Sequence, residues 1–287
     1  MQGGRISRGW ELAKRSFAVL RADRSLAVFP VISGIATLAA AIVIFGPATA
    51  IYGSSGRSEA VLIVAGVIAA YVLTFIAVFF NTALAAAAAQ SLAGRDTSFN
   101  DGFAAARGRL STILQWSLVQ GTVGLVLGLI ENYLGDSLPG RILTGLANFA
   151  WSAATFFVVP IIALEGLAPR AAFHRSVSVL KARWGEGVVG SVSITGVVLL
   201  VALIPLIVLG GGGLALMGSA PGAGAALLAI AVVIFLVAMV VGGTLNAIFR
   251  VALYQFATQG SVPGGFEPGQ LQAAFAPKKR RGVFGTR

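Results

Sequence analysis

Hydrophobic residues gather in six long stretches along the chain, separated by short polar gaps. A helix needs about 20 apolar residues to cross a bilayer, and each stretch meets that length. The pattern therefore predicts six transmembrane helices. They run over about residues 26–51, 60–90, 110–134, 142–164, 188–217 and 223–256.

Prolines and glycines interrupt several of the predicted spans. A proline inside a helix removes a backbone donor, so we expect a kink or a break at each one. We expect the run Gly210–Gly213 to end the fifth span on the external side. The prolines that lie at or inside spans are Pro30, Pro47, Pro160 and Pro205.

Lysine and arginine fall almost entirely in alternate gaps. Of the 21 cations, 19 lie in the N-terminal tail, the second and fourth gaps and the C-terminal segment. The other two, Arg57 and Arg141, lie in odd-numbered gaps. Because positively charged loops stay in the cytoplasm, the pattern predicts an all-α, multi-pass membrane protein with both termini cytoplasmic.

The composition excludes several classes of protein. The chain is 57% hydrophobic and 11% charged, whereas soluble domains carry about a quarter charged residues. The net charge of +11 flanks the spans and forms no continuous patch, so we expect no binding of nucleic acid. With no cysteine, one histidine (His174) and no phosphate-loop or hydrolase motif, we expect no cofactor, no metal site and no enzymatic activity.

Three cytoplasmic segments share an amphipathic pattern. Residues 15–22 match residues 175–182 at an offset of 160, and residues 103–108 fit the same frame more loosely. Ser98 with Asp101 predicts a helix start, and Pro169 suits a first helical turn. The expected apolar stripes are Trp10, Ala13, Phe17 and Leu20; Phe99, Phe103, Ala106 and Leu110; and Phe173, Val177, Leu180 and Trp184.

The three segments divide the chain into tandem units. Each unit is an amphipathic interfacial helix followed by a two-span hairpin, over about residues 4–92, 97–166 and 169–258. Alternatively, similar helices arose separately because all three must lie at the same interface. We expect a single membrane domain over residues 1–258, and a flexible basic cytoplasmic tail over residues 259–287.

Two groups of short motifs resemble a known family. One reads Phe156-Phe157-Val158-Val159-Pro160, then Glu165-Gly166, Arg175-Ser176 and Arg183-Trp184-Gly185. The other reads Arg8-Gly9-Trp10, then Arg15-Ser16-Phe17, Leu26 and Phe29-Pro30. Together they resemble uncharacterised bacterial six-span membrane proteins of unknown function, which are similar to the membrane domain fused to some glycerophosphodiester phosphodiesterases. The resemblance implies a bacterial inner membrane and no catalytic residues.

Two sets of residues are candidate sites. Amides and a proline inside spans form a candidate intramembrane polar site: Asn81, Pro160 and Asn246. Cations beside the spans are candidates for lipid headgroups or the interface: Arg15, Arg21, Arg107, Arg175, Lys181, Arg183 and Arg250. Arg250 lies inside the sixth span, where it either snorkels to the interface or contacts a lipid phosphate. We expect Glu165 to pair with Arg170 or with a cation of another amphipathic helix.

Two functions fit these patterns. The first is a non-enzymatic membrane module that organises lipids or partner proteins, because basic amphipathic helices line the inner interface and no carboxylate lies at the midplane. Its expected partners are the phospholipid bilayer, anionic lipids above all, and possible protein partners or further copies of the chain. The alternative is a transporter or permease for a lipid or small amphiphile, because polar residues recur at related depths of the repeat.

Overall fold

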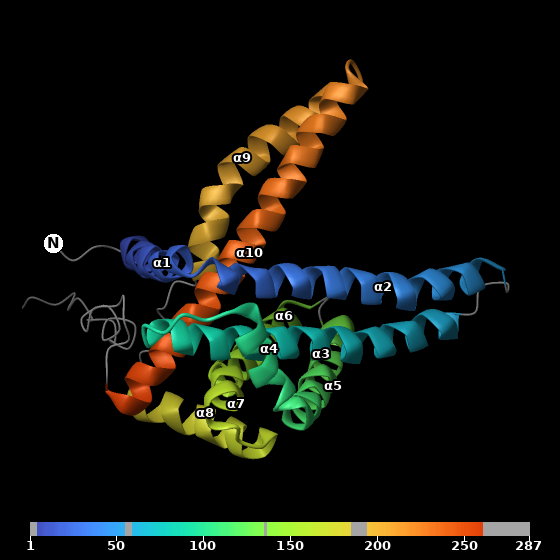
Figure 1. Ribbon diagram of the computed structural model, residues 1–287. Coiled ribbons are helices and arrows are strands. Elements are labelled where there is room, and N and C mark those ends of the chain that lie inside the picture. The colour runs from blue at the N-terminus through green and yellow to red at the C-terminus, as the bar shows by residue number, and fades with distance from the viewer. Residues whose placement is uncertain (1–4, 55–58, 135–136, 185–193, 261–287) are drawn as a thin grey trace, which may run out of the picture. The chain divides into compact units, whose positions relative to one another are not determined.

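In the computed structural model, every element of the described residues is a helix (Figure 1). The structure describes residues 5–54, 59–134, 137–184 and 194–260. The basic tail expected over residues 259–287 lies almost wholly outside them. The chain forms two compact units: one holds residues 22–177, and the other combines Met1–Arg21 with Ser178–Arg287.

Helix α3 is the centre of the unit formed by residues 22–177. It packs against α2, α4, α5 and α7, and α5 also packs against α6. Figure 1 shows α2 and α3 running side by side as a long hairpin. In chain order the elements are η1 (Arg24–Ala27), α2 (Val28–Ser54), α3 (Glu59–Leu92), α4 (Phe99–Arg107), α5 (Leu110–Leu134), α6 (Leu138–Ala154), α7 (Val158–Glu165) and the start of α8 (Pro169–Trp184).

The second unit holds α1 (Arg5–Ala22), the end of α8, α9 (Ile194–Leu216) and α10 (Pro221–Gln259). Helices α9 and α10 pack as a hairpin (Figure 1). Glycines let them approach closely, because a Cβ atom added to Gly224 would lie only 2.7 Å from the carbonyl oxygen of Gly213. Small residues at such crossings allow backbone contact between helices in a membrane.

Five helical segments are long and apolar enough to cross a membrane, which identifies the chain as a membrane protein. They are Arg24–Gly53, Glu59–Leu92, Leu110–Leu134, Leu138–Glu165 and Pro221–Gln259. Within α9, Val201–Leu216 forms a shorter apolar stretch. The 34 residues of α3 make a helix of about 51 Å, which exceeds the roughly 30 Å hydrocarbon core.

Proline and glycine affect the spans differently from what their positions in the sequence predict. The fourth span breaks at residues 155–157, just before Pro160, but α2 continues through Pro47 and α9 through Pro205. The expectation that Gly210–Gly213 ends the fifth span is wrong, because α9 continues to Leu216. A backbone group that leaves its helical hydrogen bond inside hydrocarbon finds no water to replace it. The helix therefore continues wherever no neighbouring side chain offers that group another hydrogen-bond partner.

Candidate functional site

Helix α4 docks on α3 through a glycine. Gly102 and Ala106 are its buried residues, and Gly102 lies directly against the α3 backbone. A Cβ atom at this position would lie 2.7 Å from the carbonyl oxygen of Ala83 and 2.5 Å from Cζ of Phe29. No larger residue fits without moving α4, so the absence of a side chain determines how close the two helices come.

Helix α8 docks on the fourth span through a serine. The Ser176 hydroxyl donates a 2.6 Å hydrogen bond to the carbonyl oxygen of Ala154 and accepts a 3.2 Å bond from the backbone N–H of Phe157. Both partners flank the break between α6 and α7. Ser176 and Phe157 are fully buried, and Ala154 is half-buried, so the Phe157 N–H in particular is removed from solvent. One hydroxyl therefore satisfies both a donor and an acceptor that the break releases.

Arg109 holds the other end of α7. Its Nη1 atom donates a 2.5 Å hydrogen bond to the carbonyl oxygen of Ile162, in the last turn of α7. Gly166 follows that turn in the left-handed conformation, with φ of 67°, and its N–H donates to the carbonyl oxygen of Ile161. A guanidinium at a helix C-terminus satisfies free carbonyl groups and opposes the negative end of the helix dipole.

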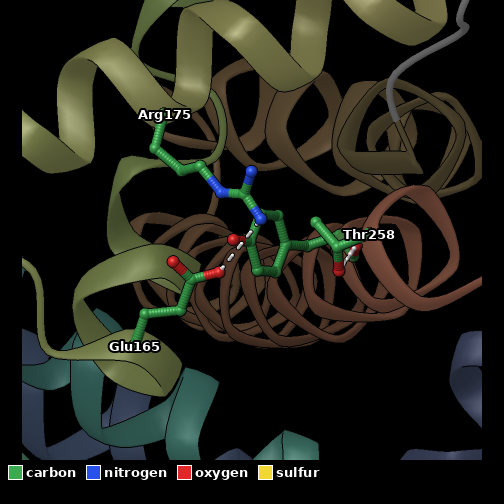
Figure 2. Close-up of polar contacts among 4 residues, drawn as sticks. Glu165, Arg175 and Thr258 are labelled. Carbon is green, nitrogen blue, oxygen red and sulfur yellow. Dashed lines mark hydrogen bonds and ion pairs between the residues drawn. The ribbon is translucent and has the colours of Figure 1, made fainter.

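An ion pair also links α7 to α8. Arg175 Nη2 lies 3.7 Å from Glu165 Oε1, and Figure 2 shows the arginine reaching from α8 toward the end of α7. Arg175 lies on α8, the same helix as the expected partner Arg170. The two side chains are 44% and 32% exposed, so solvent screens the pair and its contribution is small.

The buried face of the amphipathic helices differs from the expected stripe. In α8 the buried residues include Ala172, Ser176 and Val179, whereas the expected Phe173 and Val177 are half-buried. In α1, Ser16 is fully buried and the expected Phe17 is 49% exposed. Two residues of the expected stripes, Leu20 in α1 and Ala106 in α4, are buried as predicted. Small residues that lie one position from the stripes are buried as well, and we call these the docking residues: Ser16, Gly102 and Ser176.

A left-handed glycine follows the second helix of every hairpin. Gly94 follows α3, Gly166 follows α7 and Gly260 follows α10, with φ of 72°, 67° and 68°. Within the described part of the chain no other glycine has a positive φ. Glycine adopts this conformation without steric cost, which makes it the usual residue after a helix end.

The cations expected at the interface differ in exposure. Arg21, Arg107, Arg175 and Lys181 are exposed, and Arg15 is half-buried. Arg250 is half-buried inside α10, and the Arg183 side chain lies outside the described residues. Sequence reasoning missed the role of Arg109, which it counted only as one more cytoplasmic charge; no local pattern marks a residue that caps a helix 53 positions away.

The expected intramembrane polar residues are placed as follows. Asn81 is exposed, and its side-chain amide donates a 2.8 Å hydrogen bond to the carbonyl oxygen of Ala77 on its own helix. Pro160 is buried in the first turn of α7, among apolar neighbours in the sequence. Asn246 is half-buried in α10, in the other unit. A shared polar site for the three residues stays a prediction.

The comparisons with known proteins concern the family alone. A family model described as a family of unknown function (DUF6159) matches residues 60–265, which is more than half of the chain. No curated protein matches the chain, and no solved structure matches it. The family match fits the expected resemblance to an uncharacterised family, whereas the link to domains fused to phosphodiesterases stays a prediction.

Proposed function

The chain belongs to this family of unknown function, and we propose that it is a non-enzymatic module of the bacterial inner membrane that organises anionic lipids beneath its cytoplasmic interface. The observation that carries the proposal is the docking of α4 and α8. Each helix turns a small residue onto a span and leaves cations exposed: Arg107 on α4, and Arg175 and Lys181 on α8. Each cation near an anionic leaflet adds about 1 kcal/mol of attraction.

The connectivity supports a common location for these cations. Helix α4 joins the end of α3 to the start of α5, and α8 follows the end of α7. If α3, α5 and the α6–α7 segment each cross the bilayer once, both basic helices lie at the same interface. The positive-inside pattern assigns that interface to the cytoplasm, together with both termini.

We further propose six spans in three tandem units, with α9 as the fifth span. Gly102 lies against Ala83, and Ser176 lies against Phe157. The two docking residues are 74 positions apart in the sequence, and so are the two residues that they contact. The left-handed glycines after α3, α7 and α10 repeat at corresponding helix ends. A shared offset across two helices supports duplication, because helices that merely need the same interface have no reason to share docking partners.

Native mass spectrometry of the protein released from mild detergent tests the lipid proposal. We expect retained anionic phospholipid, and a several-fold loss of it in the double variant R107Q/K181Q. The matched control is R57Q/R141Q, which removes two cations from the gaps assigned to the external side. Equal lipid retention in both variants and the native chain would refute a role for the basic helices.

A transporter for a lipid or small amphiphile is the second candidate. Its supporting observation is the break between α6 and α7, because transporters often place substrate sites at discontinuous helices. Ser176 already satisfies the groups at this break, and Phe157, Val158 and Ile161 beside it are fully buried apolar residues. These facts favour the lipid-organising role. Unaltered flux into liposomes after N81L/N246L would eliminate the transport site as expected from the sequence.

A further inference from the structure

We infer that the N-terminal helix α1 docks on α10, the second helix of the third hairpin. In the first two hairpins, the amphipathic helix that follows the hairpin docks on its second helix: α4 on α3, and α8 on α6 and α7. The equivalent docking position of the third hairpin lies on α10. The inference is that α1, although it begins the chain, occupies this third docking position. It rests on the tandem-unit arrangement proposed above.

The partition of the chain supports this assignment. Residues Met1–Arg21 form one compact unit with Ser178–Arg287, although more than 150 residues separate them. The same partition places the first hairpin, which directly follows α1 in the sequence, in the other unit. Helix α1 therefore belongs to the same compact unit as the third hairpin.

Ser16 is the residue that makes the contact. It corresponds to Gly102 and Ser176 in the repeat, and like Ser176 it is fully buried. The hydroxyl of Ser16 is buried and has no hydrogen-bond partner. A buried hydroxyl without a partner costs about 1–3 kcal/mol, so the side chain needs an acceptor in its surroundings.

The left-handed glycines limit the acceptor to one stretch of α10. Ala83 lies 11 positions before Gly94, and Phe157 lies 9 positions before Gly166, so the equivalent stretch lies about one turn either side of ten positions before Gly260. Gly166 and Gly260 are 94 positions apart. At the same offset, Ala154 corresponds to Ile248 and Phe157 corresponds to Val251. Both Ile248 and Val251 are fully buried. The carbonyl oxygen of Ile248 is the equivalent of the Ala154 oxygen that accepts from Ser176. In a helix this oxygen still has a free lone pair, so it is the acceptor that we assign to the Ser16 hydroxyl, and α10 need not break to provide it.

Cross-linking tests the inference directly, because the native chain has no cysteine. Ser16→Cys is combined in turn with Ile248→Cys, Val251→Cys and, as a matched control, Leu236→Cys. Leu236 is exposed on the same helix, about 22 Å from Val251 along its axis. Each pair is treated with a short bis-maleimide in detergent. Replacing serine by cysteine changes little in size, and the control shares that substitution.

We expect cross-links within one chain for Ile248→Cys or Val251→Cys, and at least tenfold less for Leu236→Cys. Equal or greater cross-linking to Leu236→Cys would overturn the inference, as would the absence of any product. Cross-links only between two chains would show that α1 docks on another copy, and would also overturn it. The assay contains no anionic lipid, so its failure is distinct from a failure of the lipid-retention experiment.

Discussion

The hydroxyl of Ser176 donates a 2.6 Å hydrogen bond to the carbonyl oxygen of Ala154, at the end of α6. This bond joins an amphipathic helix to the interrupted backbone of a span. The Ser176 hydroxyl oxygen also accepts a hydrogen bond from the backbone N–H of Phe157, so the serine occupies the gap between α6 and α7. Helix α8 is thereby held by the span.

Replacing this serine tests the bond. We expect S176A to lower the free energy of unfolding by about 1–3 kcal/mol, because the buried N–H of Phe157 and the half-buried carbonyl group of Ala154 both lose this partner. Chemical denaturation in detergent measures the loss, and hydrogen exchange at residues 155–157 should increase. The control S152A removes an exposed serine from the same α6 helix and should change stability little. Equal losses in the two variants would contradict the role of Ser176.

Gly166 is needed for two reasons at once. Its φ of 67° strains any other residue, and an added Cβ would lie 2.6 Å from Arg109 Nη1. We therefore expect G166A to cost about 1–3 kcal/mol and to weaken the bond from Arg109 to Ile162. In a thermal unfolding series, G145A is the control: Gly145 lies inside α6 with open space around it, and alanine there should be neutral or stabilising. An unchanged melting temperature for G166A would show that Arg109 can move away from the added methyl group, and that this close contact is not required.

The crossing of α9 and α10 depends on Gly224. A Cβ there meets the Gly213 carbonyl oxygen at 2.7 Å and the Met217 nitrogen at 3.1 Å, both backbone atoms. We expect G224A to separate the hairpin and to destabilise it by about 1–3 kcal/mol. Gly222 lies on the same helix with no atom within 4 Å, so G222A is the matched control. If both variants melt at the same temperature, the close crossing is unnecessary.

The start of α4 should depend on pH. Ser98 and Asp101 form a capping box, in which the serine hydroxyl, and then the serine N–H, lower the pKa of the Asp101 carboxyl. Because the folded state holds the ionised form, the stabilisation is present above the ordinary aspartate pKa. It is lost as the pH falls through the lowered value.

We therefore expect amide exchange in the first turn of α4 to rise in acid, relative to the variant D101N measured at each pH. Because Asp101 is exposed, solvent screens the effect and it should stay local to α4. An identical pH profile for the native chain and D101N would show that the capping box does not respond to acid.

Local features of the sequence determined the helices and their starts. Five of the six predicted spans match helices long and apolar enough to cross a membrane, because a helix in hydrocarbon must satisfy its own backbone and needs no distant partner. The predicted span over residues 188–217 contains only the shorter apolar stretch Val201–Leu216. The capping box at Ser98 and the helix start at Pro169 are both confirmed. Each is a short-range hydrogen-bonding or steric effect that a few adjacent residues decide.

Only the tertiary structure decided which residues touch. The docking residues Ser16, Gly102 and Ser176 are buried although each lies one residue from an expected stripe, because a small side chain lets the helix reach a neighbouring backbone. Hydrophobicity alone ranks such residues as surface. The bond from Arg109 to Ile162 likewise joins residues 53 positions apart, so no local pattern of residues predicts it.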